Sequence, residues 1–233
     1  MITINGRSFK GTYNPERDTS ALALFARPYY KRGDIHLGSS FWANHADIIK
    51  CDIDAQTAAE GLKISFGYDI LVTDCTITGG YEDCVDIVRG SNIIFKNCTF
   101  IGNKTKHHIT IKGSAHTVLF EDCKFINPYR KWYDGATIDL GNWTNYDIID
   151  RPKTRNIVIR NCKTVCTPHI TVRTIHAEDP IVYDSDVKVI RVPKLFKDIF
   201  WWCRRRGWLG NSPKVDERDL KIYDQENRCF KTL

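Results

Sequence analysis

Short runs of alternating apolar and polar residues recur along the chain, and most of them are followed by a cysteine at the same place. Successive cysteines are 24, 23, 25 and 39 residues apart, and Ser185 takes the cysteine position 23 residues after the last one. The cysteines of this series are Cys51, Cys75, Cys98, Cys123 and Cys162. A period in the low twenties, built from short strands, predicts a solenoid in which each repeat forms one turn.

A second set of short runs repeats out of phase with the first, at residues 61–65, 84–87, 108–111, 136–139 and 169–172. Three of these runs close on Gly-Ser or Gly-Asn, which favours tight bends between strands. Two or three strands per turn predict an all-β fold, a single right-handed parallel β-helix of about six coils. At a spacing of about 4.8 Å per coil, the stack is expected to be on the order of 30 Å long.

The residue before most of these cysteines is Asp or Asn, which suits a bend with a left-handed backbone. The cysteine that follows is then expected to point inward and to stack on its equivalent in the next coil. Because cysteine is among the most buried residue types, the series predicts a core stripe, with metal binding as the alternative.

Three segments are expected: a strand and cap at residues 1–33, the β-helix at 34–192, and a C-terminal cap at 193–233. The apolar run at residues 21–26 predicts a short helix over the open end of the solenoid. Residues 193–207 predict a second helix, opened by Pro193 and closed by Gly207, with arginines in its last turn. This helix is interpreted as a cap, with docking to a partner or membrane surface as the alternative, and residues 216–233 predict a closing hairpin.

The composition, net charge and cysteine content of the chain limit the classes of protein to which it belongs. The chain has 233 residues, enough for one sizeable core, and its net charge of +6 does not by itself imply nucleic-acid binding. Nine cysteines, most of them in one stripe, argue against a disulfide framework and favour folding in a reducing cytoplasm. The first residues lack the pattern of a signal peptide, and no stretch is apolar enough to predict a membrane span.

The residues that open the second strand of each coil are expected to form a column. This column contains Glu60, then Glu82 and Asp83, then His107 and His108. Carboxylates on neighbouring coils would lie about 5 Å apart, a spacing that suits glycoside hydrolysis with retention, whereas larger separations suit inversion. The column is therefore a candidate acid, base and histidine set, with solvated bends as the alternative.

This part of the chain resembles polygalacturonases, which carry Asn-Thr-Asp-Gly, Asp-Asp-Cys and Gly-His-Gly on successive coils. The resemblance implies that Glu60 takes the place of the first catalytic aspartate. Glu82 and Asp83 match the aspartate pair, and His107 or His108 matches the histidine. Two of the three aspartates are glutamates here, and no Arg-x-Lys follows on the next coil.

Residues 81–91 are also similar to the coil of pectate lyases that carries two calcium-binding acids four residues apart. The resemblance implies Glu82 and Asp86 as calcium ligands, with Asp74 near the third, and hard oxygen donors of this kind suit Ca²⁺. Arg130 is the nearest match to the arginine with which those lyases abstract a proton.

One enlarged bend interleaves aromatic and basic residues. Its members are Tyr129, Arg130, Lys131, Trp132 and Tyr133. Such residues stack on sugar rings and bind carboxylates, which predicts an acidic polysaccharide as ligand. The same types dominate protein–protein contacts, so a protein partner is equally consistent with the bend.

Phage tailspikes and related virion proteins resemble this chain in using the same solenoid. That resemblance implies a non-catalytic structural or adhesion protein of a phage particle, made in the host cytoplasm and working without a cofactor. We expect contacts with other virion proteins, with polysaccharide or with copies of itself, as in the trimers of that group, and none with nucleic acid. The alternative is a lyase or hydrolase acting on acidic polysaccharide, with Ca²⁺ in the case of a lyase.

Overall fold

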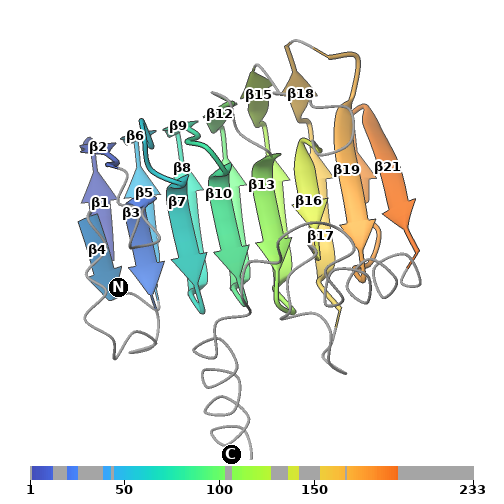
Figure 1. The fold of residues 1–233 in the computed structure, drawn as a ribbon, viewed down its shortest axis with the longest axis horizontal. Coiled ribbons are helices and arrows are strands. Elements are labelled where there is room, and N and C mark those ends of the chain that lie inside the picture. Colours follow the sequence, from blue (N-terminus) through green and yellow to red (C-terminus); the bar gives the residue numbers. More distant parts are fainter. Residues whose placement is uncertain are drawn as a thin grey trace, which may run out of the picture. The chain divides into compact units, whose positions relative to one another are not determined.

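The computed structural model describes residues 2–12, 20–25, 39–42, 45–102, 107–126, 136–141, 153–165 and 167–193. Every regular element in these ranges is a β-strand, and neighbouring strands pair in parallel within three sheets (Figure 1). The parallel β-helix predicted from the repeat is therefore confirmed.

The three sheets differ in strand number and length. The seven-stranded sheet contains β1 (Ile2–Asn5), β5 (Ala46–Ile49), β8 (Tyr68–Thr73), β11 (Ser91–Lys96), β14 (His116–Glu121), β17 (Arg155–Arg160) and β20 (Ile181–Tyr183). The six-stranded sheet contains β2 (Ser8–Lys10), β6 (Asp52–Asp54), β9 (Thr76–Thr78), β12 (Thr99–Ile101), β15 (Lys124–Ile126) and β18 (Lys163–Thr164). The eight-stranded sheet contains β4 (Ser39–Trp42), β3 (Ser20–Phe25), β7 (Glu60–Ser65), β10 (Asp83–Val88), β13 (His107–Lys112), β16 (Ile138–Leu140), β19 (Ile170–Ile175) and β21 (Val187–Val192).

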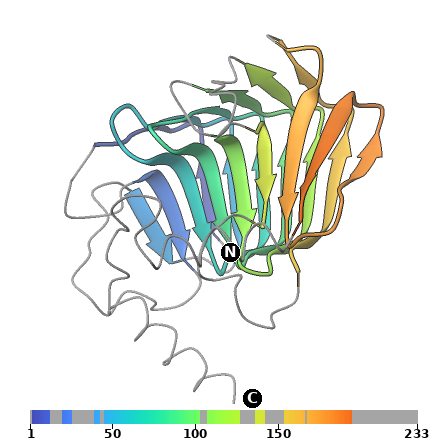
Figure 2. The same ribbon diagram turned by 45° about the vertical axis from the view of Figure 1, so that its right-hand side comes forward.

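Each coil takes one strand from the seven-stranded, the six-stranded and the eight-stranded sheet in turn. The coil β8, β9, β10 is followed by β11, which pairs with β8 and starts the next coil (Figure 2). In the described part of the chain six coils have all three strands, and β20 and β21 form part of a seventh. This agrees with the predicted number of coils.

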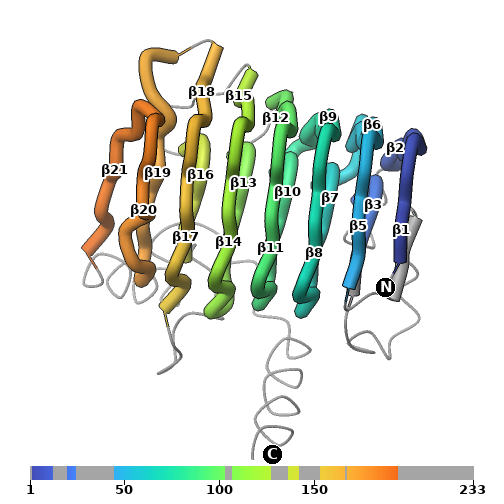
Figure 3. The backbone as a smooth tube through the Cα atoms, turned by 180° about the vertical axis from the view of Figure 1, so that it is seen from behind, coloured from blue at the N-terminus to red at the C-terminus, as the bar shows by residue number. Residues whose placement is uncertain are grey.

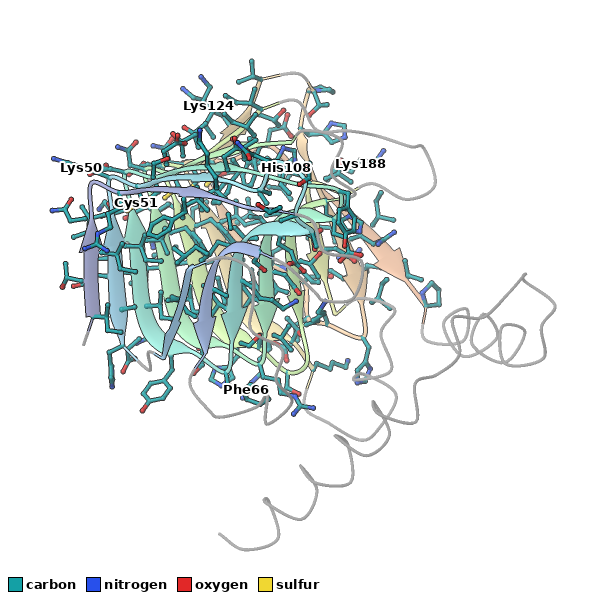
Figure 4. The ribbon with its side chains drawn as sticks, turned by 60° about the vertical axis from the view of Figure 1, so that its left-hand side comes forward. Lys50, Cys51, Phe66, His108, Lys124 and Lys188 are labelled. Atoms are coloured by element: carbon teal, nitrogen blue, oxygen red, sulfur yellow. The ribbon has the colours of Figure 1, made fainter. Side chains whose placement is uncertain are left out.

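The bends before the cysteines have the left-handed backbone that their sequence predicts. The residues at these positions have φ between 47° and 56°; they are Lys50, Asp74, Asn97, Asp122, Asn161 and Asp184. Side-chain amides link them along the stack, because Asn97 donates to Asp74 and Asn161 donates to Asp122, each at 2.6 Å. Figure 4 shows Lys50 projecting from the margin of the stack beside Cys51.

The five cysteines of the series are buried, which confirms the predicted core stripe. The Cys75 thiol lies 3.5 Å from the carbonyl oxygen of Ile48 in the preceding coil, and the Cys51 amide lies 3.4 Å from the Cys75 sulfur. Ser185 continues the ladder, since its hydroxyl accepts the Cys162 amide at 2.8 Å. All six described cysteines are free thiols.

Four phenylalanines fill the middle of the core in two stacked pairs. Phe95 stacks on Phe120 and Phe100 stacks on Phe125, both with ring centroids 5.1 Å apart. All four rings are fully buried. Each pair joins neighbouring coils, so the stack of rings holds consecutive coils together.

The helix predicted at residues 21–26 is wrong over the residues that the structure describes. Residues 20–25 form β3, which pairs with β7 on one side and with β4 on the other. Residues 21–24 are buried, which is the pattern of a strand covered on both faces. A short apolar run fits such a strand as well as it fits a buried helix, and periodicity does not separate the two.

The chain divides into two compact units, Met1–Val192 and Pro193–Leu233. The predicted C-terminal helix and hairpin belong to the second unit and lie outside the described residues, as do the enlarged bends at residues 127–135 and 142–152. The part of the chain that the structure describes contains no helix with the length and apolarity needed to cross a bilayer.

Replacing Phe100 with alanine should lower the free energy of unfolding by about 3–5 kcal/mol, because a fully buried ring is lost from the stack. Denaturant unfolding followed by circular dichroism measures this change. The matched control is Thr99→Ala, on the outward-facing side of the same strand, with an expected change within about 0.5 kcal/mol. Equal effects of the two substitutions would contradict the assignment of the core.

The buried thiols should be unreactive until the protein unfolds. Burial raises the pKa of the Cys84 thiol well above its usual range, and the thiolate is the reactive form. Of the nine cysteines, no more than the three outside the described set should react quickly with a chromogenic disulfide reagent in native buffer. All nine should react in denaturant, and four or more fast thiols in the native protein would disprove the buried stripe.

Candidate functional site

Over β7, β10, β13 and β16 the outer face of the eight-stranded sheet is largely buried, unlike that of the seven-stranded sheet. Every residue of β7 is buried, whereas β11 alternates between buried and exposed residues. The outer face nonetheless carries charged and hydroxyl side chains in one register row, one per coil. This polar row consists of Lys63, Asp86, Thr110, Asp139 and Arg173.

The start of β10 departs from strict alternation and brings a further acid beside the polar row. In β10 the consecutive residues Cys84 and Val85 both face the core, so Asp83 and Asp86 lie on the same outer side. In the next coil the amides of His108 and Ile109 both donate to the Thr137 carbonyl at 3.1 Å. The register is kept through this irregularity, since Asp83 pairs with His107 and Val85 pairs with Ile109.

The predicted column at the strand openings is present as a register column. Ser20, Glu60, Asp83 and His107 occupy equivalent positions on successive strands. Glu82 precedes β10, and its amide donates to the Ala59 carbonyl at 3.0 Å. The structure therefore brings Glu60 and Asp83 together, next to the row that contains Asp86.

The first cluster is centred on Asp86, whose carboxylate lies between two lysines on neighbouring coils. Lys63 is 3.0 Å from one oxygen and Lys112 is 3.1 Å from the other. Lys63 also contacts Glu60 at 3.1 Å, and the Ser20 hydroxyl donates to Glu60 at 2.8 Å. Burial acts to raise the pKa of Asp86, but Lys112 and Lys63 outweigh it and keep that pKa below its usual value.

Asp83 lies beside this cluster, and its pKa is shifted in the opposite direction. Burial, and then the charge of Asp86, raises the pKa of Asp83 well above its usual value. Its Oδ1 has no hydrogen-bond partner among the described residues. Two neighbouring acids thus have pKa values shifted in opposite directions.

The second cluster joins Asp139, Arg173 and His107. Arg173 binds Asp139 through two parallel hydrogen bonds of 2.8 and 2.9 Å. His107 Nδ1 accepts the Ala136 amide at 3.3 Å, and its Nε2 lies 3.7 Å from Asp139 and 3.4 Å from Arg173. Thr110 separates the two clusters, and its hydroxyl has no partner within the described ranges.

His108 belongs to the core and not to the polar row. Its Nε2 is 3.0 Å from the Ile126 carbonyl oxygen, and its ring packs edge-on against Phe125 at 5.7 Å. In the preceding coil the Cys84 thiol donates to the equivalent carbonyl, that of Ile101. Burial lowers the pKa of His108 to about 4, with the Ile126 contact opposing the shift. The alternative of an exposed bend is therefore wrong for His107 and His108, both of which are buried.

The residues predicted to bind calcium are not gathered. Asp74 lies at the bend between β8 and β9, where it accepts a hydrogen bond from Asn97, while Asp86 lies in the middle of β10. Across the described ranges, no three histidine, cysteine or acidic residues are placed to hold a metal ion. Arg130 and the binding residues predicted with it, from Tyr129 to Tyr133, lie outside those ranges.

Sequence reasoning missed four members of the polar row, namely Lys63, Thr110, Asp139 and Arg173, and also Lys112, which binds Asp86 from a neighbouring row. The available signal was a polar residue recurring in the middle of each second strand, as in Leu62-Lys63-Ile64 and Val85-Asp86-Ile87. Alternation of this kind normally indicates a face open to water, so their burial was not expected.

A family model described as the right handed beta helix region matches residues 29–151, more than half of the chain. No curated protein and no solved structure matches the chain.

Asp86→Asn should lower the free energy of unfolding by about 3–5 kcal/mol, because it leaves the buried Lys63 and the largely buried Lys112 without their shared counter-charge. Thermal and denaturant unfolding measure the change. Asp52→Asn, an exposed acid on the six-stranded sheet, is the matched control and should be nearly neutral. A small effect of Asp86→Asn would show that the lysines are solvated.

His108 should make stability depend on pH in the mildly acidic range. Its pKa is about 4 in the folded state and about 6.5 when unfolded, so the unfolded state binds more protons between these values. The contribution of His108 to the free energy of unfolding is fully present above about pH 6.5. It is lost progressively as the pH falls toward 4, by on the order of 3 kcal/mol.

The measurement compares the pH slopes of the free energy of unfolding in the wild type and in His108→Gln. The slope should flatten in His108→Gln and stay unchanged in His169→Gln, a histidine placed before β19. An identical slope in wild type and His108→Gln would refute the assignment.

Proposed function

Because the chain belongs to the right-handed β-helix family, we propose that it is a non-catalytic structural or adhesion solenoid of a phage particle, which contacts other proteins or carbohydrate. The main support for this proposal is that the candidate acids form ion pairs with lysines. Glu60 and Asp86 are each 1% exposed, and Lys63 contacts both.

An acid or base in catalysis must come within hydrogen-bonding distance of its substrate. Glu60 and Asp86 are instead held by Lys63, Lys112 and Ser20. Removing one member of a buried ion pair is costly, so these contacts favour a fixed arrangement of the coils. Such a site supports a role in holding the solenoid together more than one in turnover.

The phage setting follows the resemblance to tailspike-type solenoids. A solenoid supplies long flat surfaces made of equivalent residues on successive coils, which suits assembly with other chains or attachment to a polymer. The aromatic and basic bend that contains Arg130 and Trp132 is the proposed contact for polysaccharide or protein.

One observation favours the second candidate, a hydrolase acting on acidic polysaccharide. The pKa of Asp83 is raised and that of the neighbouring Asp86 is lowered, and a pair of acids with pKa values pushed apart is the usual arrangement of a general acid and a base. In that case Asp83 would protonate the leaving oxygen and Asp86 would activate water.

The deciding experiment incubates the full chain with a panel of acidic polysaccharides, with and without Ca²⁺. Unsaturated products are followed by absorbance and new reducing ends by a colorimetric assay. We expect no turnover above that of heat-denatured protein at a detection limit of about 0.001 per second, far below the usual range of enzymes. Retention of the protein on the same polysaccharides, once immobilised, tests carbohydrate adhesion.

Cleavage that disappears in Asp83→Asn and persists in Asp52→Asn would overturn the scaffold proposal and support the hydrolase. Calcium-dependent release of unsaturated products that disappears in Arg130→Ala or Glu82→Gln would instead support a lyase.

A further inference from the structure

The outer face of the seven-stranded sheet carries three parallel rows of side chains, and this sheet faces the viewer in Figure 3. The middle row is aliphatic and consists of Leu71, Ile94, Leu119, Val158 and Ile181, which are register partners on successive strands. The row at the strand starts consists of Asp69, Asn92, Thr117 and Asn156. The row at the strand ends consists of Thr73, Lys96, Glu121, Arg160 and Tyr183.

The aliphatic row remains partly accessible to solvent. Its first four members are half-buried by their neighbours along the row, and Ile181 is 44% exposed. Parallel sheets are normally buried on both faces, as β7 of the eight-stranded sheet is here. A continuous apolar row bordered by polar rows is the pattern of a protein-binding surface.

We propose that this face binds a second copy of the same chain, aliphatic row against aliphatic row, in a two-fold dimer. A two-fold contact uses the same patch on both copies, and a straight row of similar side chains fits its own image after rotation. A three-fold arrangement would require each aliphatic row to meet a different surface of the next copy. The trimer expected from tailspike solenoids would therefore not pair these rows.

The charges of the flanking rows select the direction of the two-fold axis. An axis parallel to the strands would place Lys96 against Arg160 of the second copy and Glu121 against its own image. An axis along the direction of coil stacking reverses the strands and exchanges the flanking rows. Each coil then faces its own copy, so Lys96 lies opposite Asn92 and Arg160 lies opposite Asn156, whose side-chain amide oxygens accept hydrogen bonds.

The size of the face fits a weak, reversible dimer. The five strands of the aliphatic row, about 4.8 Å apart and at most about 20 Å long, give a face of roughly 500 Å² per copy. The total of roughly 1,000 Å² is below the usual size of specific interfaces and is typical of weak, transient contacts.

The charged row is also ordered in advance, which reduces the entropy lost on binding. Lys96 and Arg160 contact Glu121 at 2.9 and 3.1 Å, and the Arg160 guanidinium lies 5.5 Å from the centre of the Tyr183 ring.

The inference rests on the proposed function only in treating the solenoid as a part of an assembly. The polar row lies on the eight-stranded sheet and the aliphatic row on the seven-stranded sheet. Failure of the cleavage assays and failure of dimer formation are therefore separate results.

Sedimentation velocity of the full chain over about 1–300 µM tests the dimer, in the micromolar range that a small interface favours. We expect a concentration-dependent shift from the 26.9 kDa monomer to a species of twice that mass. Leu119→Lys, at the centre of the aliphatic row, should weaken the dimer at least tenfold. Ile101→Lys, the same kind of change on the outward side of β12 in the six-stranded sheet, should leave the dissociation constant within twofold.

Circular dichroism melting of both variants confirms that they are folded. A cross-link between cysteines at position 94 of two copies, introduced as Ile94→Cys, should form readily under mild oxidation. A chain that is monomeric over the whole range, a trimer, or a dimer that survives Leu119→Lys in the folded variant would each overturn the proposal.

Discussion

Parallel stacking of the coils in register is the constraint on which the rest of this structure depends. Each strand pairs with its equivalent one coil away, so every side chain lies about 4.8 Å from its counterparts before and after it. A residue therefore fits this fold only if its side chain is compatible with the equivalent side chains of the coils before and after it. Rows of cysteine, phenylalanine and aliphatic side chains meet this condition through packing, and the Asp and Asn bends meet it through side-chain hydrogen bonds such as that between Asn97 and Asp74.

Charged residues meet the same condition only by alternating in sign. Like charges at this spacing repel, and burial strengthens the repulsion. In the polar row Lys63 is followed by Asp86, then by the uncharged Thr110, then by Asp139 and Arg173. Asp83, next to Asp86 and with no ion pair among the described residues, has its pKa raised by burial and by the charge of Asp86. The candidate site is thus a product of stacking geometry as much as of chemistry.

The sequence was most informative about features that are determined by residues within a single coil. The period of the cysteines and the Asp or Asn before them predicted the coils, the inward stripe and the left-handed bends, including the bend before Ser185. Features decided by neighbours in space were not predictable in this way. The residues of β3 read as a helix because burial on both faces removes their alternation. The break in alternation at Cys84 and Val85, which places Asp83 on the outer side, has no distinct signal in the sequence. The burial of Lys63 and Asp86 in β7 and β10 is likewise not signalled by any local pattern.

The alternating charges also give the coils an order. By their hydrophobic residues the coils are nearly interchangeable, and a solenoid of this kind can in principle lengthen or shorten by one repeat. The polar row restricts such changes. Excision of the coil that contributes Thr110 would bring Asp86 against Asp139, and duplication of the coil that contributes Asp86 would place that acid against its own copy. The length of this solenoid is thus tied to its charge sequence, so that gain or loss of a repeat in evolution would require a compensating change of charge one coil away.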